Sequence, residues 1–459
     1  YEEFFVEQLH LAYRKYERSI KTGIKVSLKA EQINFAKNLY PFNLTKDQSK
    51  VLDDILSDFK SGSPMMRLIQ GDVGCGKTVI AFSASLLMAY KEKQIALMCP
   101  TESLALQHFN NAKKYLGKFI NIRLLLGSTT AKEKTIILEE LEQGKIDLII
   151  GTHSLIQDKI SFYKLGLIII DEQHKFGVEQ RDTLAKKSDQ AHCLIMTATP
   201  IPRSLSLTQF GDLDISTIYE KPQGRNKIST KIVSPSEFGN FLNFVNTRIS
   251  LNEQVYIVVP AINQSESQDL LYLEKVQLRF QSIFSDTNVV GLHGQMKSNE
   301  KRSILADFKK GKINILIATS LIEVGIDVSN ATIMAVLNPE RFGLSSLHQL
   351  RGRVGRGNKP GFFFLVNDRS ISSDSLNRLR VIEKFDDGFK ISEEDLNIRG
   401  EGDLLGHHQS GTKFRKIANI HLHQNIFEQV CRDFKELKIN FSSIEKNASS
   451  EELTIKYTI

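Results

Sequence analysis

Residues 71–78 have the types and the spacing that bind phosphate groups. Their sequence, GDVGCGKT, fits the pattern G-x-x-x-x-G-K-[S/T]. Glycines let the backbone curl until successive N–H groups point at phosphate oxygens, and a helix expected to begin near Lys77 adds its positive end. Lys77 is expected to neutralise the β- and γ-phosphates of a nucleotide, and the Thr78 hydroxyl to ligate Mg²⁺. The alternative is a glycine-rich turn with a surface lysine. The expected nucleotide contacts are Gly71, Asp72, Val73, Gly74, Cys75, Gly76, Lys77 and Thr78.

An acidic pair, Asp171 and Glu172, follows the apolar run at 167–170. A phosphate loop needs a metal-binding carboxylate at the end of a neighbouring strand, and ligands of open α/β sheets bind at the carboxyl ends of the strands. We expect Asp171 to hold Mg²⁺ through water, and Glu172 to orient and polarise an attacking water. Alone, the pair could equally be a solvated loop. Together with the phosphate loop it predicts nucleotide hydrolysis.

Two series of short apolar runs, separated by helical patterns, could position these residues. Strands buried on both faces have this composition, and the alternation predicts parallel sheets flanked by helices. The first series comprises residues 66–70, 95–99, 122–126, 148–150, 167–170 and 194–196. The second series comprises residues 255–259, 289–292, 313–317, 333–337 and 362–366. We therefore expect two α/β domains in tandem.

The remaining segments suggest how the domains are connected. Residues 1–22 have the pattern of one amphipathic helix. Residues 221–230 break the strand-helix alternation with proline, glycine and charges, as a linker would. Residues 370–459 are polar and mostly helical in pattern. The expected divisions are an N-terminal helical segment, a first α/β domain with the phosphate loop, a second α/β domain and a C-terminal extension, at residues 1–41, 42–222, 223–386 and 387–459.

Composition excludes several classes of protein. Of the 459 residues, 41% are hydrophobic and 25% are charged, which is ordinary for a globular protein and excludes a disordered or collagenous chain. No apolar run reaches the roughly 18 residues of a membrane span. Sixty basic and 53 acidic residues give a net charge of +7, which permits a polyanionic partner. The four cysteines are widely spaced, so we expect reduced thiols in a cytosolic protein. The chain opens on Tyr1 without a signal-peptide pattern, which suggests a fragment or a processed chain.

The motifs in combination resemble those of superfamily 2 helicases. GDVGCGKT and DEQH correspond to motifs I and II. Further matches over residues 42–366 are PTE at 100–102, GTH at 151–153, TATP at 197–200, ATS at 318–320 with EVGID at 323–327, and HQLRGRVGRG at 348–357. The stretches IIIDEQHKFGVEQR, TATPIPRSLSLTQFGDLDIS and NPERFGLSSLHQLRGRVGRG resemble the RecG family nearly residue by residue. Residues 387–411 resemble its "TRG" region.

This resemblance implies a fold, an activity and a set of roles. The fold would be two tandem RecA-like parallel-sheet helicase domains with a mainly helical, TRG-type C-terminal extension. The activity would be ATP-dependent helicase or translocase action on branched DNA, such as replication forks and Holliday junctions, in recombination and repair. The family's upstream wedge domain has no room here, so we expect the carboxyl-terminal motor portion. The arginines of motif VI, Arg353 and Arg356, would act as arginine fingers from a helix start and serve with Glu172 and Lys77 in catalysis.

Nucleotide recognition would extend beyond the phosphate loop. Phe42 and Gln48 resemble the Q-motif region, where an apolar surface and an amide recognise adenine. A helix cap at Thr45, with Gln48 three residues later, is equally consistent with the sequence, and both can hold together. Motif V adds Gly325 and Asp327 as expected ATP contacts.

Residues at the corners between strands and helices would form the DNA track. Helix N-termini and hydroxyls there can bind backbone phosphates, although such residues are usually helix caps or structural histidines. Arg351 is interpreted as part of a basic helix face that touches nucleic acid. Arg399 and Gln409 would couple the motor to duplex movement; the alternative is that this stretch only ties the tail to the second domain through a buried salt bridge. The expected DNA contacts are Thr101, Thr152, His153, Gly294 and Thr319.

The expected cofactors are ATP and Mg²⁺, and the expected partner is forked or branched duplex DNA. A single-stranded DNA-binding protein is a further candidate partner. We expect a monomer without a membrane partner, in the bacterial cytosol and associated with the nucleoid. A transcription-repair coupling motor of the Mfd type and a DNA-binding scaffold with weak ATPase are the alternatives. Scattered cysteines argue against the zinc-bearing PriA helicases, and DEQH in place of DEAD argues against RNA helicases.

Overall fold

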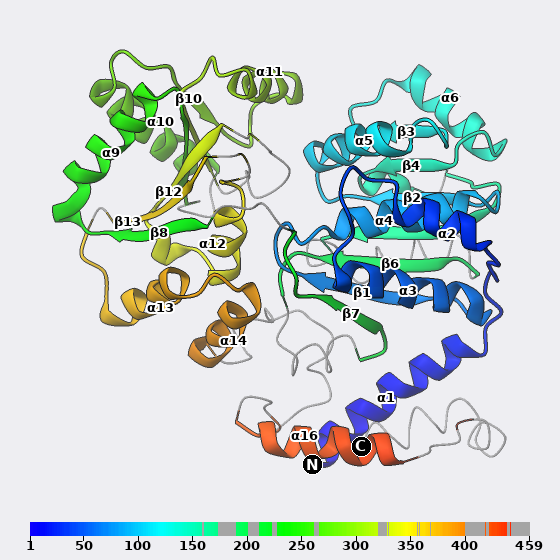
Figure 1. The fold of residues 1–459 in the computed structure, drawn as a ribbon. Helices are drawn as coiled ribbons and strands as arrows, with labels where there is room; N and C mark the ends of the chain where they lie inside the picture. The colour runs from blue at the N-terminus through cyan, green and yellow to red at the C-terminus, as the bar shows by residue number, and fades with distance from the viewer. Residues whose placement is uncertain are drawn as a thin grey trace.

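Two parallel-sheet domains lie side by side above a pair of packed helices (Figure 1). The computed structural model describes residues 1–157, 160–172, 190–200, 211–222, 227–260, 266–319, 328, 330–355, 357, 359–367, 369–399, 418, 422–437 and 441.

The first domain contains a seven-stranded sheet in the order β3-β4-β2-β5-β6-β1-β7, with every pairing parallel. Its strands are β1 Met66–Gly71, β2 Gln94–Met98, β3 Ile122–Leu125, β4 Leu148–Gly151, β5 Leu165–Asp171, β6 His192–Thr197 and β7 Asp214–Ile218. Every residue of β2, β4, β5 and β6 is buried, because helices cover both faces of the sheet. Those helices are α2 Ala30–Lys37, α3 Lys46–Ser61, α4 Lys77–Ala89, α5 Glu102–Leu116 and α6 Ala131–Glu142.

The second domain has a six-stranded parallel sheet in the order β10-β11-β9-β12-β13-β8. Its strands are β8 Ile228–Val233, β9 Gln254–Val259, β10 Val289–Leu292, β11 Ile315–Thr319, β12 Ala331–Leu337 and β13 Gly361–Val366. Its helices are α9 Phe238–Ser250, α10 Glu266–Ile283, α11 Ser298–Lys309, α12 Leu344–Arg351 and α13 Ser373–Lys384. The two-domain α/β fold predicted from the sequence is therefore confirmed.

Each predicted apolar run overlaps a strand, but two edge strands were missed. β8 begins at Ile228, inside the segment 221–230 that was predicted to be a linker, so that prediction was wrong for its last three residues. The reason is composition. An edge strand has one neighbour and partial exposure, so β8 (ISTKIV) and β7 (DISTI) carry polar residues that hide the strand signal.

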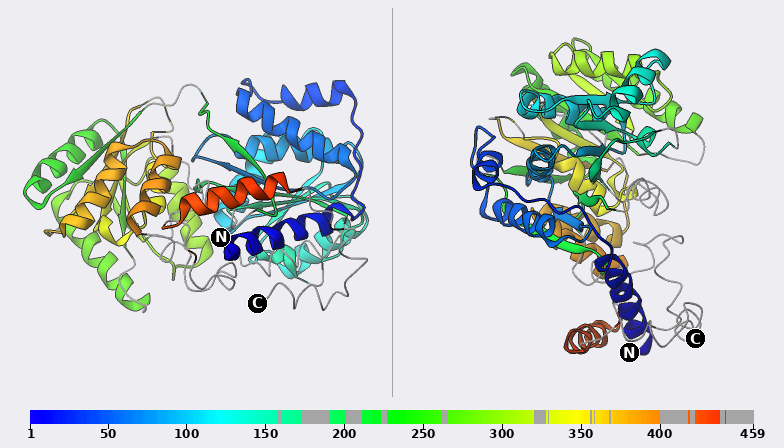
Figure 2. Two further views of the ribbon diagram at one scale, coloured as in Figure 1. Left: turned by 90° about the horizontal axis from the view of Figure 1, so that it is seen from below. Right: turned by 90° about the vertical axis from the view of Figure 1, so that its right-hand side faces the viewer.

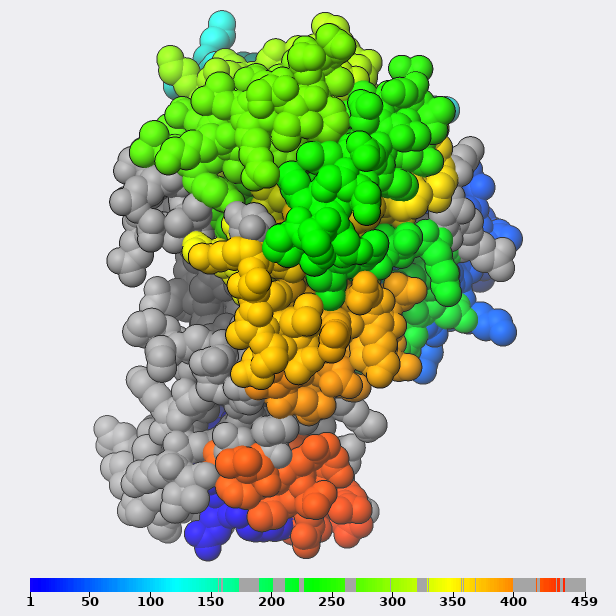
Figure 3. All heavy atoms as spheres, turned by 90° about the vertical axis from the view of Figure 1, so that its left-hand side faces the viewer, coloured from blue at the N-terminus to red at the C-terminus, as the bar shows by residue number. Residues whose placement is uncertain are grey.

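The start and the end of the described chain meet below the two sheets. α1 Glu2–Ser19 packs against α16 Gln424–Glu436, and Figures 2 and 3 show the two helices together at one end of the molecule. Phe4 meets Phe427 edge-on at 5.2 Å between ring centroids. Leu396 of α14 Gly388–Arg399 joins the same buried cluster. Lys15 binds Asp214 of β7 at 2.6 Å, which ties this helical unit to the first domain.

Among the described residues, no helix combines the length and the apolar character that crossing a bilayer would require.

Candidate nucleotide site between the two sheet domains

The phosphate loop joins β1 to α4, and α4 begins at Lys77 as predicted. Gly76 has a φ of +88°, in the left-handed region that favours glycine. A Cβ at position 76 would lie 2.3 Å from Gln48 Nε2, so a larger residue than glycine would also clash there. Lys77 is buried, and its Nζ donates hydrogen bonds to the carbonyl oxygens of Gly71 at 2.7 Å and Asp72 at 3.1 Å. The ammonium group is thus held inside the curl of the loop.

Gln48 connects the start of α3 to this loop. Its Oε1 accepts from Thr45 N at 2.9 Å, and Thr45 Oγ1 accepts from Gln48 N at 3.2 Å, which confirms the predicted helix cap. Gln48 Nε2 donates to Cys75 O at 2.8 Å, so the amide also braces the loop. Phe42 is 44% exposed and stacks on Tyr40, leaving an apolar face at the surface. Its contact with adenine stays a prediction.

Asp171 stands at the carboxyl end of β5, as predicted. The strand next to β1 is β6, however, so the carboxylate lies two strands from the loop and not on its immediate neighbour. His108 of α5 was not identified from the sequence, yet its Nε2 lies 2.7 Å from Asp171 Oδ2 and both side chains are buried. The only signal was its position on the apolar face of α5, four residues after Leu104 and four before Ala112.

Glu172 sits in a strained and partly buried position. Its φ of +57° is uncommon for a residue with a side chain, and such strain is concentrated at functional sites. Its Oε2 accepts a 3.4 Å hydrogen bond from Ala198 N, which follows β6. Burial, and then the charge of Asp171, raise the pKa of Glu172 to about 7, against the opposing effects of Lys77 and Arg353. A carboxylate with this pKa can accept a proton near neutral pH.

Arg353 reaches this site from the second domain. The preceding residue, Gly352, rests on Val73 of the phosphate loop, and the charge of Arg353 is the last of the effects that lower the pKa of Glu172. α12 ends at Arg351, so Arg353 lies in the turn after a helix end, and the predicted helix start was wrong. Arg351 itself is 3% exposed and donates to the carbonyl oxygens of Ile382 and Phe385 at 2.6 and 2.8 Å. Its interpretation as a nucleic-acid contact was therefore wrong.

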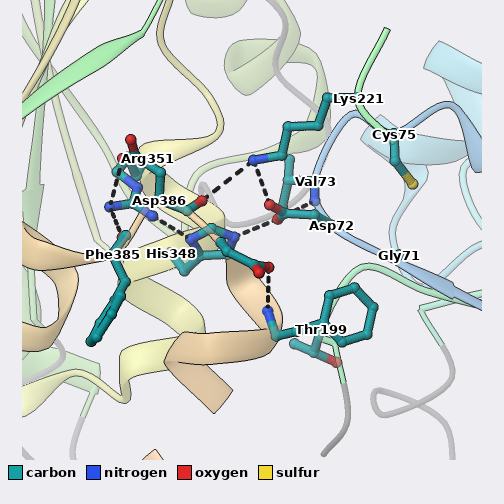
Figure 4. A network of polar contacts seen from close by, with 12 residues as sticks. Gly71, Asp72, Val73, Cys75, Thr199, Lys221, His348, Arg351, Phe385 and Asp386 are labelled. Carbon is teal, nitrogen blue, oxygen red and sulfur yellow. Dashed lines mark hydrogen bonds and ion pairs between the residues drawn. The ribbon is translucent and has the colours of Figure 1, made fainter. Parts of the chain in front are cut away.

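Polar residues join the two domains beside the phosphate loop (Figure 4). Asp72 binds His348 of α12 and, at 2.6 Å, Lys221 of the segment between the domains. Burial alone would raise the pKa of the Asp72 carboxyl, but its contact with His348, followed by that with Lys221, holds this pKa well below its ordinary value. A second bridge joins Arg302 of α11 to Glu102 at 3.3 Å. The sequence motifs indicated neither contact.

The oxygen donors at this site suit Mg²⁺. Thr78 lies in the first turn of α4, and Asp171 at the end of β5. No cluster of three or more His, Cys, Asp and Glu that could hold a metal occurs among the described residues. Magnesium commonly takes one or two protein oxygens and completes its shell with water and substrate phosphates. A hydroxyl and one carboxylate therefore fit Mg²⁺ better than a metal that needs a cage of protein ligands.

The corner residues differ in what their side chains do. Thr101 caps α5, because its Oγ1 accepts from Leu104 N at 3.3 Å. Thr152 and Thr319 are buried at the ends of β4 and β11, and neither hydroxyl has a hydrogen-bond partner within the described part of the chain. His153 and Gly294 are exposed. Gly325, Asp327, Arg356 and Gln409 lie outside the described residues, as does the side chain of Arg399.

The buried carboxylate of Glu172 predicts a stability that depends on pH. Because its pKa is raised in the folded state, its contribution is fully present below the ordinary value of 4.5 and is lost as the pH rises through about 7. Glu172→Gln should therefore raise the melting temperature of the nucleotide-free protein at pH 8 and change it little at pH 5. Each unit of pKa difference is worth about 1.4 kcal/mol. Thermal unfolding across this range tests it, with the exposed Glu139→Gln as control. An equal effect at both pH values would contradict the assignment.

The contact between His108 and Asp171 predicts a change in metal dependence. Supporting contacts of metal ligands are typically worth roughly 10- to 100-fold in affinity or activity. His108→Ala should therefore raise the Mg²⁺ concentration that half-saturates nucleotide hydrolysis by at least about tenfold. His108→Gln, which retains an N–H donor, should lose less. Identical Mg²⁺ titrations for all three proteins would show that His108 does not orient Asp171.

Three family models match the chain in order. Residues 45–207 match the DEAD/DEAH box helicase model, and residues 237–358 match the helicase conserved C-terminal domain. Residues 385–451 match the model described as ATP-dependent DNA helicase RecG, domain 3, C-terminal.

Curated relatives and solved structures agree with these matches. The ATP-dependent DNA helicase RecG of Aquifex aeolicus is 41% identical over 99% of this chain and 58% of its own length. The one from Streptococcus pneumoniae is 44% identical over 92% of this chain and 63% of its own length. The chain thus spans about three-fifths of these relatives. A structure of RecG bound to a three-way DNA junction superposes with a TM-score of 0.76 at 38% identity, covering 93% of this chain and 56% of that one. Mss116p bound to single-stranded RNA and AMP-PNP is 17% identical, with a TM-score of 0.60 over 82% of this chain and 81% of its own, and shares the fold alone.

The phosphate loop, Asp171 and Glu172 lie within the DEAD/DEAH box match, and the motif VI turn lies within the helicase C-terminal match. The chain belongs to the RecG family of helicases.

Proposed function

We propose that this protein is an ATP-driven DNA translocase that unwinds and remodels branched DNA. One observation carries the proposal: Gly352, the residue before Arg353 in the second domain, rests on Val73 of the phosphate loop that holds Lys77. Groups for phosphoryl transfer are thus divided between two domains. Hydrolysis that requires both domains can convert a chemical step into movement of one domain against the other.

Each residue has a distinct role in this mechanism. The loop N–H groups and Lys77 bind the β- and γ-phosphates of ATP, and Thr78 and Asp171 hold Mg²⁺, which would neutralise phosphate charge when bound. Glu172 orients the attacking water and accepts its proton, for which a pKa near 7 is suited. Arg353, together with Arg356, stabilises charge that spreads over the γ-phosphoryl oxygens. Arginine fingers of this kind are worth roughly 10³ to 10⁵ in rate.

The DNA track would run over the carboxyl ends of strands in both domains. Thr152 and Thr319 occupy similar positions, because Thr152 directly follows β4 in one sheet and Thr319 is the last residue of β11 in the other. A buried hydroxyl without a partner is costly, so a phosphate oxygen would satisfy a donor that the described chain leaves unused. Thr101, His153 and Gly294 lie at equivalent corners. These contacts would be with the DNA backbone, so binding should weaken steeply with salt.

The choice of branched DNA rests on the relatives. The structure of RecG bound to a three-way junction is similar to 93% of this chain, and residues 385–451 match the model of RecG domain 3. We extend this to action at replication forks and Holliday junctions in recombination and repair, in the bacterial cytosol and as a monomer. A single-stranded DNA-binding protein is a candidate partner. We place helicase domain 1 at residues 42–222, helicase domain 2 at 223–386 and the coupling extension at 387–459.

Coupling between hydrolysis and DNA movement is assigned to the extension, with Arg399 and Gln409. α14 ends at Arg399, and Leu396 one turn earlier packs against α1 and α16. Arg399→Ala should keep DNA-stimulated ATP hydrolysis within about threefold of wild type but slow branch migration at least about tenfold, the equivalent of about 1.4 kcal/mol. Fluorescence-based strand separation and phosphate release, measured in the same solution, test this. Parallel losses in both rates would rule out a coupling role.

The proposed activity is tested by phosphate release with and without forked DNA. Wild type should show DNA-stimulated hydrolysis. Lys77→Ala should reduce it at least about 100-fold, or about 2.7 kcal/mol, because the β- and γ-phosphates lose their cation. The melting temperature and DNA binding should stay close to those of wild type. Hydrolysis without DNA stimulation in the wild type would leave only a scaffold role, and normal turnover by Lys77→Ala would refute the phosphate-loop assignment.

A further inference from the structure

Asp72 carries a carboxylate that a phosphate loop does not need for its backbone contacts. The side chain is 3% exposed, and burying a carboxylate is unfavourable unless its oxygens are paired. Its Oδ1 accepts from Val73 N at 2.6 Å and is bonded to His348 Nε2, while Lys221 Nζ lies 2.6 Å from Oδ2. Two of these three partners come from outside the first sheet. The second domain and the connecting segment therefore supply the polar partners that make burial of this carboxylate tolerable.

The direction of the bond between Asp72 and His348 is set by Arg351. Arg351 Nη2 lies 2.8 Å from His348 Nδ1, and a guanidinium nitrogen can only donate. Nδ1 is therefore an acceptor, and Nε2 must carry the proton that it donates to Asp72. Arg351 is itself held by the Ile382 and Phe385 carbonyls at the end of α13. Arg351 thus holds the imidazole on the side opposite Asp72, in one orientation and one tautomer (Figure 4).

A second contact brings the same two segments together. A Cβ at Gly352 would lie 2.6 Å from Val73 Cγ1, so the end of α12 rests directly on the phosphate loop. Arg353 is the next residue along the chain. Two adjacent contacts, Asp72 with His348 and Val73 with Gly352, therefore fix the position from which Arg353 extends.

We propose that Asp72 and His348 form a latch between the phosphate loop and α12, and that this latch positions Arg353 for hydrolysis. Both are positioning residues, because they act on ATP through Arg353. The inference rests on the proposed ATPase function and adds to it a positioning role for the side chains of both residues.

The C-terminal extension closes over this latch. Gly388 is the first residue of α14, and a Cβ there would lie 2.7 Å from His348 Nε2 and 3.0 Å from Asp72 Oδ1. Tyr219, which directly follows β7, contacts Phe389 with 4.9 Å between ring centroids. Glycine at 388 is thus required by space, although alanine is the better helix former. A single added methyl group should disturb the latch without removing any polar atom.

The first test is a double-mutant cycle on Asp72→Ala and His348→Ala. Each single variant should lower DNA-stimulated kcat at least about tenfold and leave the Kd for a non-hydrolysable ATP analogue within about threefold, because the loop binds phosphate through its backbone. The double variant should lose no more than either single variant, since both break one contact. Losses that multiply, or singles with normal kcat, would overturn the proposal. Weakened analogue binding that matches the loss in kcat would instead show a defective loop and would also overturn it.

The second test does not depend on removing a polar group. Gly388→Ala should lower kcat to the same degree with analogue binding retained. Gly239→Ala is the matched control, since Gly239 lies in the first turn of α9 and a Cβ there would meet nothing within 4 Å. Its kcat should be that of wild type. Equal kcat for Gly388→Ala and Gly239→Ala would contradict a latch at this position.

A third measurement separates failure of the latch from failure of the proposed function. Spin labels on cysteines that replace the exposed Lys91 and Lys310 report the distance between the domains without nucleotide or DNA. Cys431, which is not fully buried, is replaced by serine so that it is not labelled. Asp72→Ala, His348→Ala and Gly388→Ala should each broaden this distance distribution, and Gly239→Ala should not. If wild type has no ATPase, the proposed function fails and the distances still test the latch. If wild type hydrolyses ATP and the distances are unchanged in all variants, the latch alone is wrong.

Discussion

The charged groups to which we assign the proposed ATP hydrolysis are divided between the two sheet domains, and burying them in either domain alone would be unfavourable. The first sheet domain holds Lys77, Asp171 and Glu172 within or beside its strand ends, and the second contributes Arg353. Burial raises the pKa of Glu172, while Lys77 and Arg353 oppose that rise. The acid is therefore easiest to ionise when both cations are near. Docking of the domains would therefore also favour the ionised form of Glu172, the proposed base, because docking brings Arg353 toward it.

The parallel sheets explain why these groups can meet. Ligand-binding residues of such sheets gather at the carboxyl ends of the strands, and the loop after β1, the acids after β5 and the turn after β6 lie at one edge of the first sheet. The second domain presents the end of α12 to that edge. From there, contacts continue through Arg351 to the end of α13, and through α14 to Phe4 and Phe427. A displacement of α12 would therefore be transmitted to the extension through packed elements.

Much of this arrangement could be predicted from the sequence, because strong local signals report it. Strands buried on both faces are continuous apolar runs, and GDVGCGKT and the acids after β5 specify the loop and the carboxylates by type and spacing. β8 escaped prediction because an edge strand needs few apolar residues. His108 has the spacing of an ordinary core residue, so nothing in α5 marks its contact with Asp171. Arg351 was misassigned because charge suggests exposure, whereas here backbone carbonyls bury the guanidinium. Asp72 and His348 are 276 positions apart, and only the packing of two domains brings them together.

The structure of this chain with ADP, aluminium fluoride, Mg²⁺ and forked DNA would test the central claim most directly. The account predicts that the fluoride group, which mimics the γ-phosphoryl in transit, contacts Lys77 from one domain and the Arg353 guanidinium from the other. An analogue bound at Lys77 with Arg353 directed away from it, on a surface that faces solvent or DNA, would contradict the division of the site between the two domains.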